Sequence, residues 1–181
     1  MAARESIPAP ARSVLFVCLG NICRSPAAEG VMQRLVDERG LGDRVRVDSA
    51  GLLDYHTGSA ADERMRAAAQ RRGLALDSRA RQVTDADFTA FDLLVCMDRG
   101  NFDQLAEIAD DLDIEAVGSG QLRMLGSFLP DAEGDREPDQ HAEVPDPYYG
   151  GADGFEHVLA LLTDAMPAVL DTLLAEPGQT G

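Results

Sequence analysis

Residues 13–26 read Ser13-Val-Leu-Phe-Val-Cys-Leu-Gly-Asn-Ile-Cys-Arg-Ser-Pro26, and this stretch decides the fold. Its first six residues form a largely apolar run, which is typical of a strand buried on both faces of a sheet. Ser25 followed by Pro26 predicts a helix with serine as the N-cap and proline at the first helical position. Apolar residues then recur at helical spacing until Gly40, which we expect to end the helix. The stretch therefore predicts a strand, a tight loop and a helix.

The same alternation continues along the chain. Further strands are predicted from apolar runs at residues 44–50, 91–97 and 121–128. Further helices are predicted from two capping-box patterns, Ser59 with Asp62 and Thr84 with Asp87, and from an apolar stripe over residues 155–173 with a kink at Pro167. The alternation predicts a three-layer α/β fold, in which an open parallel sheet of about four strands carries helices on both faces. Because ligands of such sheets bind beyond the carboxyl ends of the strands, we expect a phosphate-binding loop directly after Cys18.

The length of the chain predicts one domain, because 181 residues compare with ~150 for a typical domain. We expect this domain over residues 13–175, with flexible tails at 1–12 and 176–181. No apolar run approaches ~20 residues, and the first twelve residues lack the apolar core of a signal peptide. Three cysteines are too few for a disulfide framework and leave one unpaired. We therefore expect a cytoplasmic monomer, with export by a route that uses no standard signal peptide left open.

The charge balance excludes several classes of function. Thirty-two acidic residues outnumber sixteen basic ones, for a formal net charge of −16. Such a charge repels phosphate backbones, which argues against non-specific binding to nucleic acid or to anionic membranes. Every basic residue is an arginine, so a lysine-dependent phosphate loop and a lysine Schiff base are both excluded. An alanine-rich chain without lysine is also typical of GC-rich bacterial genomes, such as those of actinobacteria.

Residues 18–25, which we call the anion loop, have the composition of an oxyanion-binding site. A tight loop that leads into a helix aims several backbone N–H groups at one point, and the helix dipole adds positive potential there. Gly20 and Asn21 suit the left-handed backbone conformations that such a nest needs. Arg24 can donate two hydrogen bonds to one tetrahedral oxyanion. The loop is therefore predicted to bind a phosphate group.

Cys18 lies where it could attack that phosphate group. Cysteines at helix N-termini or beside arginine ionise more readily than ordinary thiols. In-line attack would give a phosphocysteine that water later hydrolyses, and Ser25 could donate a hydrogen bond to the sulfur. A short Cys-x5-Arg pattern also occurs by chance as a buried strand-end cysteine, but the accompanying Gly, Asn and Ser-Pro favour catalysis. A redox dithiol is a weaker interpretation, because four residues rather than two separate Cys18 from Cys23.

Asp146 is the candidate proton donor for the leaving group. It stands in Val144-Pro-Asp-Pro-Tyr-Tyr149, where the flanking prolines restrict its backbone. The two tyrosines that follow could line a slot for a flat aromatic group. General acid catalysis typically contributes 10²–10⁴-fold to a rate. Taken alone, Asp146 could equally be a turn residue in an acidic loop.

Taken together, the motifs resemble those of the low-molecular-weight protein-tyrosine phosphatases over roughly Ser13 to Leu174. The matching segments are residues 14–26, Val47-Asp-Ser-Ala-Gly51, Arg79-Ala-Arg-Gln82, Cys96-Met-Asp98 and Asp146-Pro-Tyr-Tyr-Gly150. The resemblance implies hydrolysis of phosphotyrosine in proteins, with inorganic phosphate as product and no metal or organic cofactor. It implies Cys18 as nucleophile, Arg24 as phosphate clamp and Asp146 as general acid, then base. The implied substrate-binding and loop-bracing residues are Leu19, Gly20, Asn21, Ile22, Cys23, Ser25, Ser49, Tyr55, Tyr148 and Tyr149.

The resemblance also assigns finer roles. Asn21, Ser25 and Ser49 are expected to brace the loop through hydrogen bonds, and Leu19 with the three tyrosines to wall an aromatic slot. Asp98 is expected either to hold Arg24 or to cap the helix that follows it. Cys23 is expected to form a reversible disulfide with an oxidised Cys18 and so protect it, whereas Cys96 is expected to be a core residue.

The chain departs from the family pattern at two places. Many members have a histidine, bonded to the loop asparagine, where this chain has Ser78, so we expect looser bracing of the loop or a substituting water. The acidic stretch from Asp131 to Glu143 is long, and we expect it to be solvated.

Three alternatives remain open. Thioredoxin-coupled arsenate reductases share the fold but need two further cysteines late in the chain, and only Cys96 lies downstream here. Protein-arginine phosphatases resemble the family but carry threonine in place of Ile22 and lack the paired tyrosines. A non-catalytic phospho-ligand binding module would need the loop but not both Cys18 and Asp146.

Overall fold

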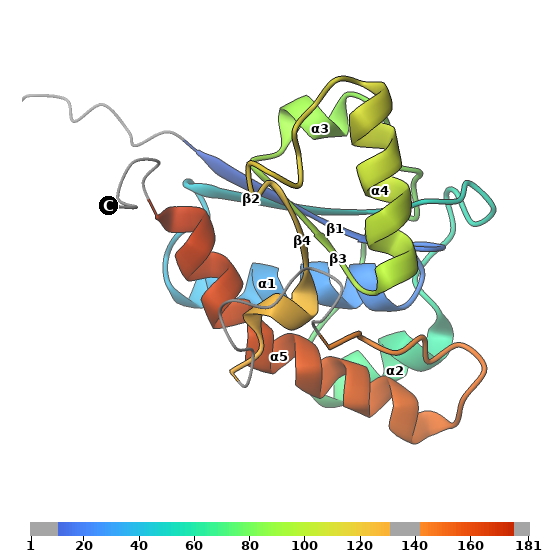
Figure 1. Ribbon diagram of the computed structural model, residues 1–181. Helices are drawn as coiled ribbons and strands as arrows, with labels where there is room; N and C mark the ends of the chain where they lie inside the picture. Colours follow the sequence, from blue (N-terminus) through green and yellow to red (C-terminus); the bar gives the residue numbers. More distant parts are fainter. Residues whose placement is uncertain (1–10, 131–141, 176–181) are drawn as a thin grey trace, which may run out of the picture.

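Four parallel strands form the central sheet of the computed structural model, which describes residues 11–130 and 142–175 (Figure 1). The strands are β1 (Arg12–Cys18), β2 (Val45–Gly51), β3 (Leu93–Cys96) and β4 (Leu122–Met124), in the order β2-β1-β3-β4. All three strand pairs are parallel. The predicted fold class, an open parallel sheet with helices on both faces, is confirmed.

Helices cover both faces of the sheet. Those in the described residues are α1 (Arg24–Glu38), α2 (Glu63–Arg71), α3 (Asp87–Ala90), α4 (Arg99–Asp111), the 3₁₀ helix η1 (Leu125–Phe128) and α5 (Ala152–Leu174). Figure 1 shows α1, α2 and α5 below the sheet and α3 and α4 above it. The sheet is therefore the middle of three layers.

Strand β1 is the axis of the core, because its side chains are buried on both faces. Val14 and Phe16 belong to the cluster that includes residues of α1, α2 and α5. Leu15 and Val17 belong to the second cluster, with residues of α3 and α4. Successive side chains of a strand point to opposite faces, so an unbroken apolar run is what this central position requires. The same run explains why the strand was predictable.

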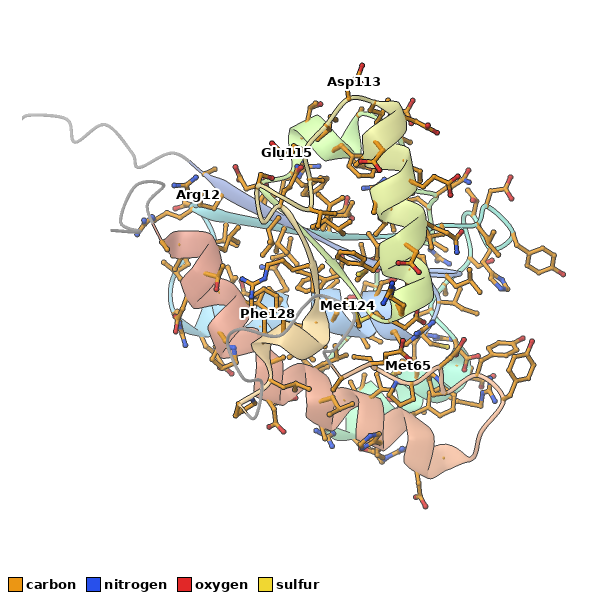
Figure 2. All side chains as sticks on the ribbon, viewed as in Figure 1. Arg12, Met65, Asp113, Glu115, Met124 and Phe128 are labelled. Carbon is orange, nitrogen blue, oxygen red and sulfur yellow. The ribbon has the colours of Figure 1, made fainter. Side chains whose placement is uncertain are left out.

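The final helix α5 contributes the largest apolar stripe of the lower layer. Nine of its residues are buried, and Pro167 lies inside the helix. By length and composition α5 could cross a membrane, but here its buried side chains pack in the core cluster with β1 and α1. Figure 2 shows Met65, a fully buried α2 residue of this same cluster, and also Phe128 of η1.

Two helix starts differ from the predictions. Helix α1 begins at Arg24, so Ser25 is not its N-cap, and Cys23 occupies the cap position without a side-chain hydrogen bond. Helix α2 begins at Glu63, and its cap is Asp62, whose carboxylate accepts from Arg64 N. The Ser59 capping box is therefore wrong, because the acid expected at the third helical position is itself the cap.

Other boundaries also shifted. The carboxylate of Asp87 accepts from Thr84 N at 2.8 Å, as in a capping box, but α3 begins only at Asp87 itself. The strand expected over 121–128 is short and gives way to η1. Arg12, expected in a tail, is the first residue of β1. Residues 1–10 and 176–181 of the predicted tails, and residues 131–141 of the acidic stretch, lie outside the described residues.

The topology places three loops at one edge of the sheet. Strand β1 has β2 on one side and β3 on the other, so the chain order reverses at β1, and ligand sites form where the order reverses. The anion loop follows β1, and Asp98 follows β3 two residues after its end. Gly51 ends β2 directly beneath the loop, since a Cβ there would lie 3.0 Å from Leu19 O and from Asn21 N. This edge is where the candidate site forms.

Candidate active site

The anion loop has a backbone shaped by two small residues, for different reasons. Asn21 has a φ of 55°, in the left-handed region predicted for it. Gly20 does not, so that part of the prediction is wrong. Its missing side chain instead makes room for a neighbour, because a Cβ on Gly20 would lie 3.1 Å from Cδ2 of His56.

A chain of side-chain hydrogen bonds braces the loop from behind. Asn21 Nδ2 donates to Ser25 Oγ at 2.8 Å and to Ser49 Oγ at 3.0 Å. Ser49 Oγ also lies 2.5 Å from Glu29 Oε2, and Ser25 Oγ lies 3.0 Å from Cys18 Sγ. The network therefore runs from a carboxylate in α1 through two serines and one amide to the sulfur.

The donors and acceptors give this network a direction. A carboxylate only accepts, so Ser49 donates to Glu29 and uses a lone pair for Asn21. Ser25 likewise accepts from Asn21, which leaves its hydroxyl hydrogen for Cys18 Sγ or for Ala50 O, 3.3 Å away. The amide oxygen of Asn21 is occupied as well, because it accepts from Arg81 N at 3.0 Å.

Arg24 is buried in the floor of the site, only 3% exposed. Its Nη1 donates to Asp98 Oδ2 at 2.6 Å and to Val144 O at 3.1 Å. Burial opposes the charge of this guanidinium, but Cys18, Asp98 and Asp146 outweigh it, and its pKa is raised above the ordinary value. The guanidinium is thus held charged and aimed by groups from two other segments. Asp98 also accepts from Asn101 N at 2.8 Å, so both roles expected of Asp98 are present in one side chain.

Asp146 comes to the same place from the far end of the chain. Its Oδ2 lies 3.6 Å from Arg24 Nη2, and its side chain is 43% exposed. The segment before it is anchored by Val144 N, which donates to Met97 O at 2.8 Å. The segment after it is turned by Tyr148 N, which donates to Asp146 Oδ1 at 3.0 Å. The carboxylate therefore faces the anion loop and remains open to solvent.

These groups open into one pocket of about 440 Å³. Ten of the site residues predicted from the sequence line this pocket: Cys18, Leu19, Gly20, Ile22, Cys23, Arg24, Tyr55, Asp146, Tyr148 and Tyr149. Three other predicted residues are buried behind the loop and do not line the pocket: Asn21, Ser25 and Ser49. They brace the loop and do not contact the pocket. Two further lining residues, Leu53 and His56, were not expected. Their only sequence signal was proximity to Tyr55.

The rim of the pocket is aromatic and exposed. The rings of Tyr148 and Tyr149 meet edge to face, with centroids 4.9 Å apart. The guanidinium of Arg64, in the first turn of α2, lies 5.2 Å from the Tyr148 centroid and 4.9 Å from that of Phe155. Tyr55 stands on another loop and is 84% exposed. Such a rim could contact both faces of a flat ring that enters between the two loops.

The three cysteines have different surroundings. Cys23 lines the pocket beside Cys18, and burial, followed by the charges of Asp62 and Cys18, raises its pKa to about 12. Cys96 is fully buried in β3, where desolvation raises its pKa, in keeping with the core role predicted for it. Within residues 11–130 and 142–175, no three His, Cys, Asp or Glu side chains form a group that could hold a metal ion.

Comparison with known proteins agrees with this geometry. Residues 13–179 match the family model described as low molecular weight phosphotyrosine protein phosphatase. The low molecular weight protein-tyrosine phosphatase A of Mycobacterium tuberculosis is 43% identical over 158 residues, which are 87% of this chain and 89% of that one.

Solved structures give the same result. A protein tyrosine phosphatase from Entamoeba histolytica superposes with a TM-score of 0.78 at 37% identity, over 90% of this chain and 97% of that one. A Drosophila arginine phosphatase superposes with a TM-score of 0.76 at 30% identity, over 91% and 99%. On these similarities, the chain belongs to the low molecular weight phosphotyrosine protein phosphatase family.

Proposed function

We propose that this protein hydrolyses phosphotyrosine in proteins through a phosphocysteine intermediate. The observation that carries the proposal is the convergence of a thiol, a guanidinium and a carboxylate from separate segments on one pocket: Cys18, Arg24 and Asp146. A module that only bound phosphate would need neither the thiol nor the exposed acid.

In the first step, the Cys18 thiolate attacks phosphorus in line with the ester oxygen. The S–P bond forms as the P–O bond to the phenol breaks, and Asp146 gives its proton to the departing oxygen. The backbone amides of the loop and the guanidinium of Arg24 bind the three phosphoryl oxygens, where charge is concentrated in the transition state.

In the second step, water attacks phosphorus. Asp146, now a carboxylate, takes the proton from that water, the S–P bond breaks, and the electron pair returns to sulfur. The hydroxyl of Ser25 lies 3.0 Å from Cys18 Sγ and can donate to the thiolate that leaves. Inorganic phosphate is the product.

The aromatic rim supports phosphotyrosine as the substrate. Tyr55, Tyr148 and Tyr149 stand above the loop, where a phenyl ring attached to the bound phosphate would lie between them. The Drosophila neighbour, whose name is arginine phosphatase, makes phosphoarginine the second candidate. Ile22 lines the pocket where we expect threonine in arginine phosphatases, which favours tyrosine. We also propose that the protein acts in the cytoplasm as a monomer, without a metal or organic cofactor.

Turnover of three phosphopeptides tests the proposal. Phosphotyrosine peptides should be hydrolysed far faster than matched phosphoserine or phosphoarginine peptides, in the presence of EDTA. Cys18→Ser should abolish turnover, and rapid acid quenching of the native enzyme should trap phosphate on the peptide that contains Cys18. Faster release from phosphoarginine would establish the second candidate instead, and strict metal dependence would overturn the mechanism.

The leaving group tests the role of Asp146. Asp146→Ala should reduce kcat/KM by about 10²-fold or more for a phenyl ester, and much less for an activated nitrophenyl ester, because only the poor leaving group needs the proton. Asp164→Ala is the matched control, since Asp164 is an exposed acid on α5 and does not line the pocket. Equal losses with both esters would show that Asp146 is not the acid.

A further inference from the structure

His56 is a histidine of the pocket wall to which the mechanism above gives no role. It lies in the segment between β2 and α2, is half-buried, and lines the pocket with Cys18 and Arg24. Its ring turns one edge toward the anion loop: a Cβ built on Gly20 would lie 3.1 Å from its Cδ2 and 3.7 Å from its Nε2. The nitrogen Nε2 therefore lies on the edge of the ring nearest the loop, next to the carbon Cδ2 that makes the closest approach.

The position of this ring is fixed by its neighbours. Ser59 N donates to the carbonyl of His56 at 2.8 Å, and Thr57 N donates to Asp54 O at 3.0 Å, so the segment is a tight turn. Tyr55 packs edge to face against the imidazole, with centroids 4.8 Å apart. Within the described residues, no side-chain or backbone group forms a hydrogen bond with either ring nitrogen. The imidazole is thus placed at the site with its hydrogen-bonding capacity unused.

Arg24 is the single positively charged side chain among the described residues that line the pocket, so a protonated His56 would add a second positive charge there. Besides His56, the titratable groups that line the pocket are Cys18, Cys23, Arg24, Asp146 and the three tyrosines, and Asp54 is on the same turn as the histidine. Arg24 already faces two carboxylates, those of Asp98 and Asp146. A doubly charged oxyanion therefore meets a cation whose field is partly cancelled. Histidine is the side chain that changes charge near neutral pH, and a protonated imidazole here would restore positive potential.

We propose that His56 is an additional oxyanion-binding residue of this site, and that its protonated ring strengthens the binding of dianions. The proposal rests on the proposed function only in taking the anion loop as the phosphate site. A bound dianion supplies the hydrogen-bond partner that the imidazole lacks, and the interaction acts on ground-state binding of substrate and product. Gly20 is part of the same arrangement, since any side chain there would push the ring away.

Sulfate binding tests this proposal, because sulfate stays doubly charged over the range in which histidine side chains titrate. The parent protein is Cys18→Ser, which replaces the ionisable thiol of the site by a hydroxyl. Its sulfate dissociation constant is measured by calorimetry at about pH 5.5 and about pH 8, which bracket that range. His56→Gln and His56→Phe are added to this parent, and Phe preserves the packing against Tyr55. His157→Gln is the control, because His157 is an exposed histidine of α5 that does not line the pocket.

We expect the parent to bind sulfate about three- to tenfold more tightly at the lower pH, as one added charge within several ångströms of a dianion predicts. Both His56 substitutions should remove most of this gain, and His157→Gln should keep it. Asp146 and Glu29 remain in every variant, so the comparison between variants isolates the contribution of His56. An unchanged pH dependence in the His56 variants, or none in the parent, overturns the role of His56. If no variant binds sulfate at either pH, the anion site itself fails, and the proposed function fails with it.

Discussion

Asp98 gives a prediction that separates two functions of one carboxylate. One oxygen accepts from Arg24 Nη1 at 2.6 Å, and the other accepts from Asn101 N at 2.8 Å as the cap of α4. Asp98→Ala removes both contacts. Asp98→Asn preserves one acceptor oxygen for the cap, but turns an NH₂ group toward a guanidinium that can only donate.

The structure gives the size of each effect. Loss of the cap costs about 1 kcal/mol. Loss of a hydrogen bond between charged groups costs about 1.5–3 kcal/mol, and burial of Arg24, whose side chain is 4% exposed, favours the upper part of that range. We therefore expect Asp98→Asn to lower the free energy of unfolding by about 2.5 kcal/mol, and Asp98→Ala by about 3.5 kcal/mol.

Activity should fall further than stability suggests. Arg24 keeps its hydrogen bond to Val144 O but loses the contact that fixes the plane of the guanidinium. A displacement of about 1 Å can cost about 10²-fold in rate, so we expect kcat/KM for an aryl phosphate to fall by between ten- and a hundredfold in both variants.

Urea unfolding followed by circular dichroism, together with steady-state kinetics, checks these values; the chain has no tryptophan to report on unfolding. If Asp98→Asn matches the native protein in both measurements while Asp98→Ala is less stable, Asp98 is only a helix cap. The assignment of Asp98 to Arg24 would then be wrong.

Three further predictions test the surroundings of the site. Cys23→Ser should recover less activity in dithiothreitol after peroxide treatment than the native protein, because the disulfide expected to protect Cys18 cannot form; equal recovery would argue against it. Gly51→Ala should weaken inhibition by phosphate several-fold, since a Cβ 3.0 Å from the loop backbone must displace the loop, at a stability cost of about 1–3 kcal/mol. Burial raises the pKa of Asp87, but hydrogen bonds from Arg81 outweigh burial and hold this pKa below its ordinary value. The Asp87–Arg81 pair contributes its full stability above the pKa that an aspartate has in the unfolded chain, about 3.9. This contribution is lost as the pH falls through the lower pKa that Asp87 has in the folded protein. Arg81→Met should therefore lower stability at neutral pH and flatten its decline in acid, which unfolding midpoints measured against pH would show.

The fold was predictable wherever burial alone determines the sequence pattern. The apolar runs of β1 and β3 and the stripe of α5 are signals of that kind, and each led to the correct element. Helix starts were less predictable, because a capping side chain has several possible partners. Ser25 fits the N-cap pattern, but its hydroxyl is bound to Asn21 and lies beside Cys18 Sγ. The conformation of such site residues is determined by contacts with distant parts of the chain and not by the local sequence pattern.

The candidate site was predictable in its chemistry but not in all of its walls. Local motifs indicated Cys18, Arg24 and Asp146, and the pocket contains all three. His56 carried no motif, since its position depends on how the turn after β2 folds over Gly20. The conformation assigned to Gly20 was wrong for the same reason. A glycine can be required by its own φ or by a neighbour's approach, and only the structure distinguishes the two.

Ser78 stands where the resemblance predicts a histidine, and the loop asparagine nevertheless has a partner for each of its side-chain polar groups. The oxygen of Asn21 accepts from Arg81 N, and both of its N–H groups have serine acceptors. The same network includes Glu29, which accepts a hydrogen bond from Ser49. Burial raises the pKa of Glu29, and hydrogen bonds from Ser49 and Ser78 oppose this rise. Only the ionised carboxylate compels Ser49 to donate to it and accept from Asn21. Protonation of Glu29 would remove that constraint on the Asn21–Ser49 hydrogen bond, whereas the contacts of Asn21 with Ser25 and Arg81 do not involve Glu29. The bracing of the anion loop therefore includes one carboxylate that lies outside the pocket.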